Sequence, residues 1–209
     1  MHIAILTFQG FNELDSLIAL GVLSRIKKSD WRVTICCPEP EVTSMNGVTV
    51  RAQSMLEDAA AADAVIVGSG VKTREVVRNP ELMGRLSLEP NRQLVAAQCS
   101  GMLVLAKLGL VGNIPACTDL ATKPWVQEAG VEVLNQPFFA SGNVATAGGC
   151  LASVYLAAWV IARTEGIEAA ASALRYVAPV GEKDALVANA LRQIEPYLAL
   201  QRQLEREES

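Results

Sequence analysis

The stretch Gln93-Leu-Val-Ala-Ala-Gln-Cys-Ser-Gly-Met-Leu-Val-Leu-Ala-Lys-Leu-Gly109 decides how this chain folds. Its beginning is mostly apolar and predicts a buried strand over 93–98. Residues 102–108 have the pattern of a helix, and Gly109 is suited to end it. Because so little chain separates strand from helix, we expect the residue at the junction, Cys99, at the carboxyl edge of a sheet. Open α/β sheets bind their ligands at that edge.

Strand and helix signals alternate along the rest of the chain, which predicts βαβ units around a mostly parallel sheet. Further elements follow the same alternation, with strands at 2–8, 31–37 and 64–67 and helices at 13–28, 56–62, 148–163 and 167–176. Asn46-Gly47 lies between two β-rich stretches and predicts a hairpin over 42–50. No linker or repeat interrupts the pattern. We therefore expect one domain over residues 1–200, followed by a polar tail over 201–209.

Composition excludes several classes of protein. The 209 residues are 51% hydrophobic and 19% charged, which allows a large core, and the net charge is −4. An acidic chain has no electrostatic reason to bind nucleic acid or an anionic membrane. The longest apolar run, 151–162, is too short to cross a bilayer, and the apolar start lacks the basic region of a signal peptide. We expect a cytoplasmic protein with neither nucleic acid nor membrane as a partner.

The cysteine and histidine content also limits the chemistry. The chain has 5 cysteines, and none is spaced as Cys-x-x-Cys. This predicts reduced thiols rather than a disulfide framework or a zinc site. The single histidine is His2, whereas most His-based metal sites need two or more imidazoles. We expect neither a metal nor a cofactor.

Cys99 is the candidate nucleophile. At the start of a helix, free N–H groups and the helix dipole favour a thiolate, so we expect a lowered thiol pKa. Ser100 and Gly101 are small, which allows a sharp turn and the approach of a substrate. The alternative is that Cys99 is a small buried apolar residue, as most free cysteines are. Cys117 and Cys150 are expected in the core, although Cys150 opens a helix after two glycines, and its alternative position is near the site.

Two further segments belong at the same sheet edge. Gly68-Ser69-Gly70 ends the preceding core strand, and its bare backbone N–H groups suit an oxyanion hole. The alternative is an ordinary glycine-rich turn. Asp15 lies in the first turn of the helix after the first strand, where an acid can exchange a proton with the thiol or with a substrate. Alternatively, Asp15 forms a capping box with Asn12, because the spacing is right for one.

Four short segments together resemble the ThiJ/PfpI superfamily over residues 1–178: Phe11-Asn-Glu-Leu-Asp15, Val67-Gly-Ser-Gly70, Ala97-Gln-Cys-Ser-Gly101 with Leu103-Val-Leu-Ala, and Thr146-Ala-Gly-Gly149. The resemblance implies the class I glutamine amidotransferase-like fold. This is an α/β, flavodoxin-like three-layer sandwich with a mostly parallel central sheet and a nucleophile elbow, the sharp strand-to-helix turn that carries the nucleophile. It also implies a small-molecule substrate and a homodimer.

Within that superfamily, Cys-Ser-Gly after the strand and an aspartate in the first helix look most like the isonitrile hydratase group. The resemblance implies Cys99 as nucleophile, Asp15 as acid and Ser100 as the neighbouring hydroxyl. It further implies that backbone N–H groups around Ser69 and Gly70 stabilise negative charge.

The chain departs from many relatives in lacking a histidine at the site. Ser100 follows the cysteine, and Asp119 stands where the last residue of a Thr-Thr-His segment would align. Asp119 is either a second carboxylate at the pocket or a plain loop residue. His2 cannot substitute, since it begins the first strand, roughly 17 Å from the carboxyl edge. Without an imidazole to protonate a leaving amine, peptidase and amidase activities are disfavoured.

Three functions remain open. The first is a cysteine-dependent hydro-lyase that adds water to a small electrophile, with an isonitrile as the example. The second is a glyoxalase-like or deglycase-like enzyme acting on small carbonyls. The third is a stress protein without turnover that senses oxidants through Cys99. For the pocket wall, Trp125, Phe138 and Phe139 are candidates, with core packing as their alternative role. The residues after Gly166 are neither basic enough nor numerous enough for a pair of helix-turn-helix units, so we do not expect a DNA-binding regulator.

Overall fold

A seven-stranded sheet forms the centre of the computed structural model, which describes residues 1–207 and the side chains of residues 1–198. The strand order is β5-β2-β1-β6-β7-β9-β8. Neighbouring strands pair in parallel, except that β8 runs antiparallel to β9. The end of the predicted polar tail, residues 208–209, lies outside the described residues, as do the side chains of the whole tail.

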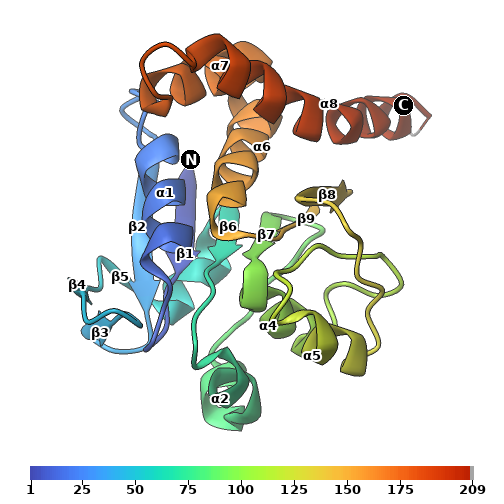
Figure 1. Cartoon of the computed structure of the whole chain (residues 1–209). Coiled ribbons are helices and arrows are strands. Elements are labelled where there is room, and N and C mark those ends of the chain that lie inside the picture. Colours follow the sequence, from blue (N-terminus) through green and yellow to red (C-terminus); the bar gives the residue numbers. More distant parts are fainter. Residues whose placement is uncertain (208–209) are drawn as a thin grey trace.

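The strands follow the predicted alternation with the helices (Figure 1). Their bounds are β1 (His2–Leu6), β2 (Arg32–Cys37), β3 (Glu41–Thr43), β4 (Thr49–Arg51), β5 (Ser54–Met55), β6 (Ala64–Val67), β7 (Leu94–Gln98), β8 (Phe138–Ser141) and β9 (Val144–Ala147). β3 and β4 form a separate antiparallel pair, which confirms the hairpin around Asn46-Gly47.

The α-helices are α1 (Glu13–Leu23), α2 (Thr73–Arg78), α3 (Pro80–Gly84), α4 (Met102–Lys107), α5 (Lys123–Glu128), α6 (Ser153–Glu165), α7 (Ile167–Val177) and α8 (Lys183–Glu207). Three short 3₁₀ helices connect elements: η1 (Leu56–Ala61), η2 (Cys99–Gly101) and η3 (Cys150–Ala152). In the described part of the chain, no helix has the length and apolar character needed to cross a membrane.

Two apolar cores lie on opposite faces of the sheet, because successive strand side chains point to opposite sides. Along β1, Ile3 and Ile5 pack with helices α1, α6, α7 and α8, whereas Ala4 and Leu6 pack with η1, α2, α3, α4 and α5. Figure 1 shows α1 and α6 side by side on the first of these faces. The result is the predicted three-layer α/β sandwich with a mostly parallel central sheet.

Some predicted helices are wrong in extent or type. The helix expected over 13–28 ends at Leu23, where the indole N–H of Trp31 donates to the Leu23 carbonyl at 2.9 Å. The 56–62 segment is a 3₁₀ helix rather than an α-helix. The helix expected from residue 148 begins at Ser153, because Gly149 has φ +88° and is followed by the turn of η3.

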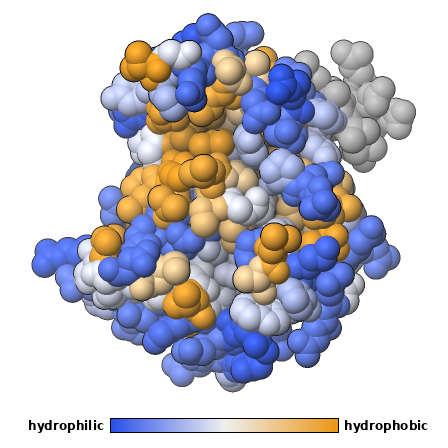
Figure 2. Space-filling view, in the orientation of Figure 1, coloured by the Kyte–Doolittle hydropathy of each residue, from blue (hydrophilic) through white to orange (hydrophobic). Residues whose placement is uncertain are grey.

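The surface carries an apolar area over α1 and α6, on the face seen in Figure 2. Leu14 and Leu17 on α1 and Leu151 on η3 are exposed, and α1 packs against η3. Exposed apolar patches of this kind mark interaction surfaces in many proteins.

Candidate active site

Cys99 occupies the junction between β7 and η2, and its backbone is left-handed. Its φ of +46° is the one positive value outside glycine in the described chain. A residue with a side chain is rarely held in this conformation, and such strain concentrates at functional sites. Gly101 makes the turn feasible, since a Cβ there would lie 2.4 Å from the carbonyl oxygen of Val67. The predicted sharp strand-to-helix turn at Cys99 is therefore present.

The register of the sheet brings the predicted segments to one edge. Val67 of β6 pairs with Leu6 of β1 on one side and with Ala97 of β7 on the other. Ser69 lies two residues after Val67, and Cys99 lies two residues after Ala97. Both residues therefore lie at the carboxyl edge of the sheet. The helix α1 starts from the same edge and supplies Asp15.

Asp15 is buried, with 1% of its surface exposed, and it faces the thiol. A carboxylate oxygen of Asp15, Cys99 Sγ and Cys150 Sγ all lie within 4.8 Å of one another. The Ser69 hydroxyl donates to Oδ2 of Asp15, and Oδ1 has no hydrogen-bond partner among the described residues. The capping-box alternative fails, because Asn12 caps α1 through the Leu14 N–H while Asp15 bonds Ser69.

The surroundings of Asp15 and Cys99 disfavour a negative charge on either side chain. Burial raises the pKa of Asp15, and the charge of Asp119 raises it further. Burial also raises the pKa of Cys99, as do the nearby charges of Asp15 and Asp119. The predicted lowering of the thiol pKa is therefore wrong, because Cys99 is only 4% exposed and has a carboxylate beside it. Near neutral pH the thiol carries its proton, and Asp15 is the group positioned to accept it.

The Ser100 hydroxyl faces the Gly70 turn. It accepts a hydrogen bond from the Gly70 N–H at 3.1 Å and lies 2.8 Å from the hydroxyl of Thr73. In this arrangement the Gly70 N–H is occupied, so it would stabilise a developing anion only after the Ser100 hydroxyl moved. The oxyanion role of Ser69 and Gly70 stays a prediction. The sequence gives no reason to place Thr73 at the site, because Thr73 is an ordinary first residue of α2.

Asp119 shows features of both alternatives. Its Oδ1 accepts from the backbone N–H groups of Ala121 and Thr122, each at 2.9 Å, which is the structural role of a loop aspartate. It also lines the pocket that contains Cys99. The carboxylate therefore contributes negative charge to the pocket wall while it holds the turn before α5.

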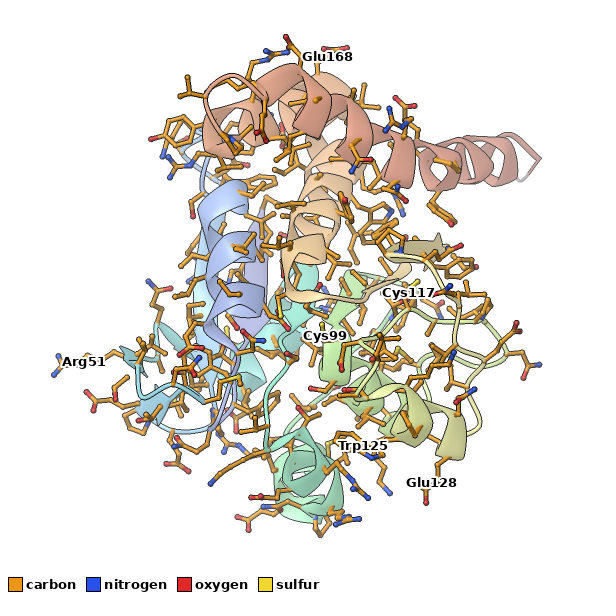
Figure 3. The ribbon with its side chains drawn as sticks, viewed as in Figure 1. Arg51, Cys99, Cys117, Trp125, Glu128 and Glu168 are labelled. Atoms are coloured by element: carbon orange, nitrogen blue, oxygen red, sulfur yellow. The ribbon has the colours of Figure 1, made fainter. Side chains whose placement is uncertain are left out.

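A pocket of about 250 Å³ opens onto Cys99. Its walls combine polar groups with apolar side chains, among them Ser69, Asp119, Met45, Val71 and Trp125. Trp125 belongs to α5 and lies below Cys99 in the view of Figure 3. Of the aromatic candidates, Trp125 lines the pocket, whereas Phe138 packs in the core against Trp159. Phe139 contacts the ring of Tyr197.

Two side chains beside the thiols, Gln98 and Asn12, were not predicted to belong to the site. Gln98 Nε2 lies 3.4 Å from Cys99 Sγ and donates to the Gly149 carbonyl at 2.7 Å. Asn12 Nδ2 donates to Cys150 Sγ at 3.1 Å. Cys150 is half-buried beside the site, which is the alternative position that its two preceding glycines had suggested, whereas Cys117 is buried in the core as expected. The thiols of Cys99 and Cys150 and the Asp15 carboxylate are also donors that suit a thiophilic metal ion.

His2 is remote from this cluster. Its Nε2 lies 2.8 Å from the Thr34 hydroxyl, at the beginning of β1 and β2. Asp15, Cys99 and Ser69 lie at the other end of the same parallel strands. The expectation that no imidazole serves the thiol is confirmed.

Comparison with known proteins places this arrangement in a family. The model of the DJ-1/PfpI family matches residues 1–163. The chain belongs to the DJ-1/PfpI family. The ThiJ/PfpI resemblance is thus confirmed at the level of the superfamily, and no curated protein matches the chain significantly.

Several solved structures share the fold. The VC2308 protein is 22% identical with a TM-score of 0.72, over 89% of this chain and 97% of the other. Drosophila melanogaster DJ-1beta is 21% identical with a TM-score of 0.73, over 84% and 96%. A ThiJ/PfpI family protein from Pseudomonas syringae is 16% identical with a TM-score of 0.72, over 93% and 87%. At these identities the likeness establishes the fold alone.

Proposed function

We propose that this DJ-1/PfpI protein is a cysteine-dependent hydro-lyase that adds water to a small electrophile, in the manner of an isonitrile hydratase. One observation carries the proposal. The Cys99 thiol lines a pocket of about 250 Å³, and its acid–base partner is the buried carboxylate of Asp15 rather than an imidazole. Burial raises the pKa of Asp15, so its carboxylate is a stronger base than a solvated one and can accept the thiol proton and then return it.

The first step forms a bond between sulfur and carbon. Asp15 takes the proton of the Cys99 thiol while the sulfur attacks the terminal carbon of the isonitrile, R–N≡C. The same carboxyl group then delivers that proton to the carbon, which leaves a thioimidate, R–N=CH–S–Cys99. Oδ1 of Asp15, which has no partner among the described residues, suits this transfer, because no other hydrogen bond has to break.

The second step releases the product. Asp15, again a carboxylate, takes a proton from water as the water oxygen adds to the thioimidate carbon. The nitrogen and the departing sulfur receive the two protons that water has supplied, and the carbon–sulfur bond breaks. The product is the N-substituted formamide, R–NH–CHO, and the thiol is restored. Net addition of water expels no amine, which is why the lack of a histidine does not prevent the reaction.

A second candidate is turnover of a small carbonyl such as methylglyoxal, as in glyoxalase-like relatives. The observation that favours it is Asp119, a further carboxylate on the wall of the same pocket. With Asp15 beside the thiol and Asp119 on the pocket wall, one carboxylate can remove a proton from the substrate and the other can return one. The same variants test both substrates.

The decisive experiment is a substrate panel of alkyl isonitriles and methylglyoxal. We expect formamide production by the wild type and background rates for Cys99→Ala and Asp15→Asn. Cys36→Ala is the matched control, since Cys36 is a buried thiol on β2 outside the pocket. Full isonitrile turnover by Cys99→Ala would reject the proposal, and turnover of methylglyoxal alone would favour the second candidate.

We also propose that the protein is a cytoplasmic homodimer. The exposed Leu14, Leu17 and Leu151 give a second copy an apolar surface to bury. Light scattering coupled to size-exclusion chromatography tests this, with Leu17→Glu expected to weaken the dimer. A wild-type protein that remains monomeric at high concentration contradicts it.

A further inference from the structure

A second thiol lies at the active site, and the proposed hydration makes no use of it. Cys150 opens η3, between β9 and α6, far from the elbow in the sequence. In the fold its Sγ lies within 4.8 Å of both Cys99 Sγ and a carboxylate oxygen of Asp15. Among the described residues, this is the one group of its kind that the side chains form.

The Cys150 thiol has a hydrogen-bond donor and a carboxylate base beside it. Asn12 Nδ2 donates to its sulfur at 3.1 Å, which stabilises electron density there. Within the described part of the chain, Asp15 Oδ1 is buried without a hydrogen-bond partner, and the carboxylate lies beside both sulfurs. Each thiol thus has an amide donor, Asn12 or Gln98, and the two share one base.

We propose that Cys150 is a resolving thiol, which converts oxidised Cys99 into a Cys99–Cys150 disulfide and gives the protein a thiol-dependent hydroperoxide-reducing activity. Asp15 takes the proton of the Cys99 thiol as its sulfur attacks the hydroperoxide ROOH. The O–O bond breaks, a new S–O bond forms, and RO⁻ leaves as ROH with the proton from Asp15. Cys99 is then a sulfenic acid.

The second step uses the shared base again. Asp15 takes the proton of Cys150, whose sulfur attacks Cys99 Sγ. The S–O bond breaks, the S–S bond forms, and hydroxide leaves as water with the proton held by Asp15. An external dithiol restores both thiols by exchange. The sum is ROOH plus a dithiol giving ROH, water and a disulfide.

The geometry allows the bond to form. A disulfide needs sulfurs about 2.05 Å apart, so the pair must close by less than about 3 Å from their present separation. Cys150 is half-buried and follows two glycines, and Gly149 has φ +88°, so the segment that carries it is a turn rather than a regular helix. Peroxide reaches Cys99 through the pocket of about 250 Å³.

The other three thiols lie in different surroundings. Cys36 and Cys37 are neighbours on β2, where adjacent side chains point to opposite faces of the sheet. Cys117 is fully buried in the core. The expected oxidation is therefore confined to Cys99 and Cys150. It requires an oxidant, whereas hydration does not, so the two activities succeed or fail separately.

The test compares the products of mild hydrogen peroxide on the reduced, metal-free full chain. By intact mass we expect the wild type to lose two hydrogen atoms, with Cys99 and Cys150 linked in peptide maps and dithiothreitol reversing the change. Cys150→Ala should instead gain two oxygen atoms on Cys99, as a sulfinic acid that dithiothreitol does not reverse. Cys117→Ala is the matched control and should form the disulfide as the wild type does.

Two results overturn the proposal. One is a wild type that forms the sulfinic acid on Cys99 as fast as Cys150→Ala does. The other is a disulfide that maps to different cysteines. Repeated consumption of peroxide with dithiothreitol as reductant, lost in Cys150→Ala and Cys99→Ala but kept in Cys117→Ala, establishes the activity itself. Isonitrile turnover measured under reducing conditions reports on the proposed hydration independently.

Discussion

Replacing Asp15 by asparagine should make the protein more stable while it removes the acid on which catalysis depends. The carboxylate is 1% exposed, and its Oδ1 has no hydrogen-bond partner among the described residues. Leaving a buried polar atom unpaired costs about 1–3 kcal/mol. The amide of asparagine also leaves one polar atom unpaired there, so the gain comes from removing the buried charge, which costs more to bury than a neutral unpaired group does. Asp15→Asn should therefore raise the free energy of unfolding near neutral pH by about 1–3 kcal/mol.

The size of the gain should depend on pH. Burial raises the pKa of Asp15 above its usual value of 3.8, so the native state holds this proton more tightly than the unfolded chain does. As pH rises above about 4, the unfolded chain ionises first and native stability is lost. The amide has no such proton. The stability difference between Asp15→Asn and the wild type should therefore be small near pH 4 and larger near pH 8.

Urea denaturation at both pH values measures the difference directly, and thermal melting supports it. For a chain of this size, about 2–4 °C accompanies each kcal/mol, so the midpoint at pH 8 should rise by about 2–12 °C. Glu128→Gln, an exposed acid on α5, is the matched control and should stay within about 0.5 kcal/mol of the wild type. An Asp15→Asn protein less stable than the wild type at pH 8, or equally shifted at both pH values, would refute the reasoning.

Four other measurements probe the elbow, the acid, the buried thiols and the pocket wall. Gly101→Ala should destabilise by more than about 3 kcal/mol in urea titrations, because its Cβ would lie 2.4 Å from the Val67 carbonyl, whereas Gly21→Ala, with open space around it, should stabilise by about 0.5–1 kcal/mol. The kcat/KM of hydration should fall at acid pH as Asp15 gains its proton, with the midpoint of the fall above pH 3.8. A pH–rate profile that stays flat would contradict this. Burial raises the pKa of Cys37 and Cys117 to about 12 each, so iodoacetamide at pH 8 should leave both unmodified in peptide maps of the folded protein. Trp125→Ala should raise KM more than it lowers kcat, since Trp125 lines the pocket without belonging to the cluster of thiols and carboxylate.

The parts of the site that could be predicted from sequence are those that sheet geometry decides. Parallel strands end at one edge, so Ser69 and Cys99, two residues beyond their paired strand positions, had to meet. The direction of the Cys99 pKa could not be read this way, because burial depends on packing of the whole pocket. The position of Cys150 stayed open between the core and the site for a related reason. The turn at Gly149 decides it, because this turn brings the Cys150 sulfur to the thiol of Cys99.

The replacement of an imidazole by a carboxylate changes the charge balance of the nucleophile. A thiolate beside an imidazolium is a neutral pair, whereas Cys99 and Asp15 with one shared proton carry a net negative charge in a buried place. Because this pair holds a single proton, it can complete a reaction cycle only if the proton that it gives to the substrate is replaced in the next step. Net addition of water meets that requirement, because every proton delivered to the substrate is returned by the water that follows. Reduction of a hydroperoxide meets it as well, since each leaving oxygen departs with the proton that Asp15 took from a thiol. Amide cleavage, which must also protonate an amine as it leaves, places a heavier demand on the single carboxyl group, and the chain's one imidazole, on His2, lies at the opposite end of the sheet.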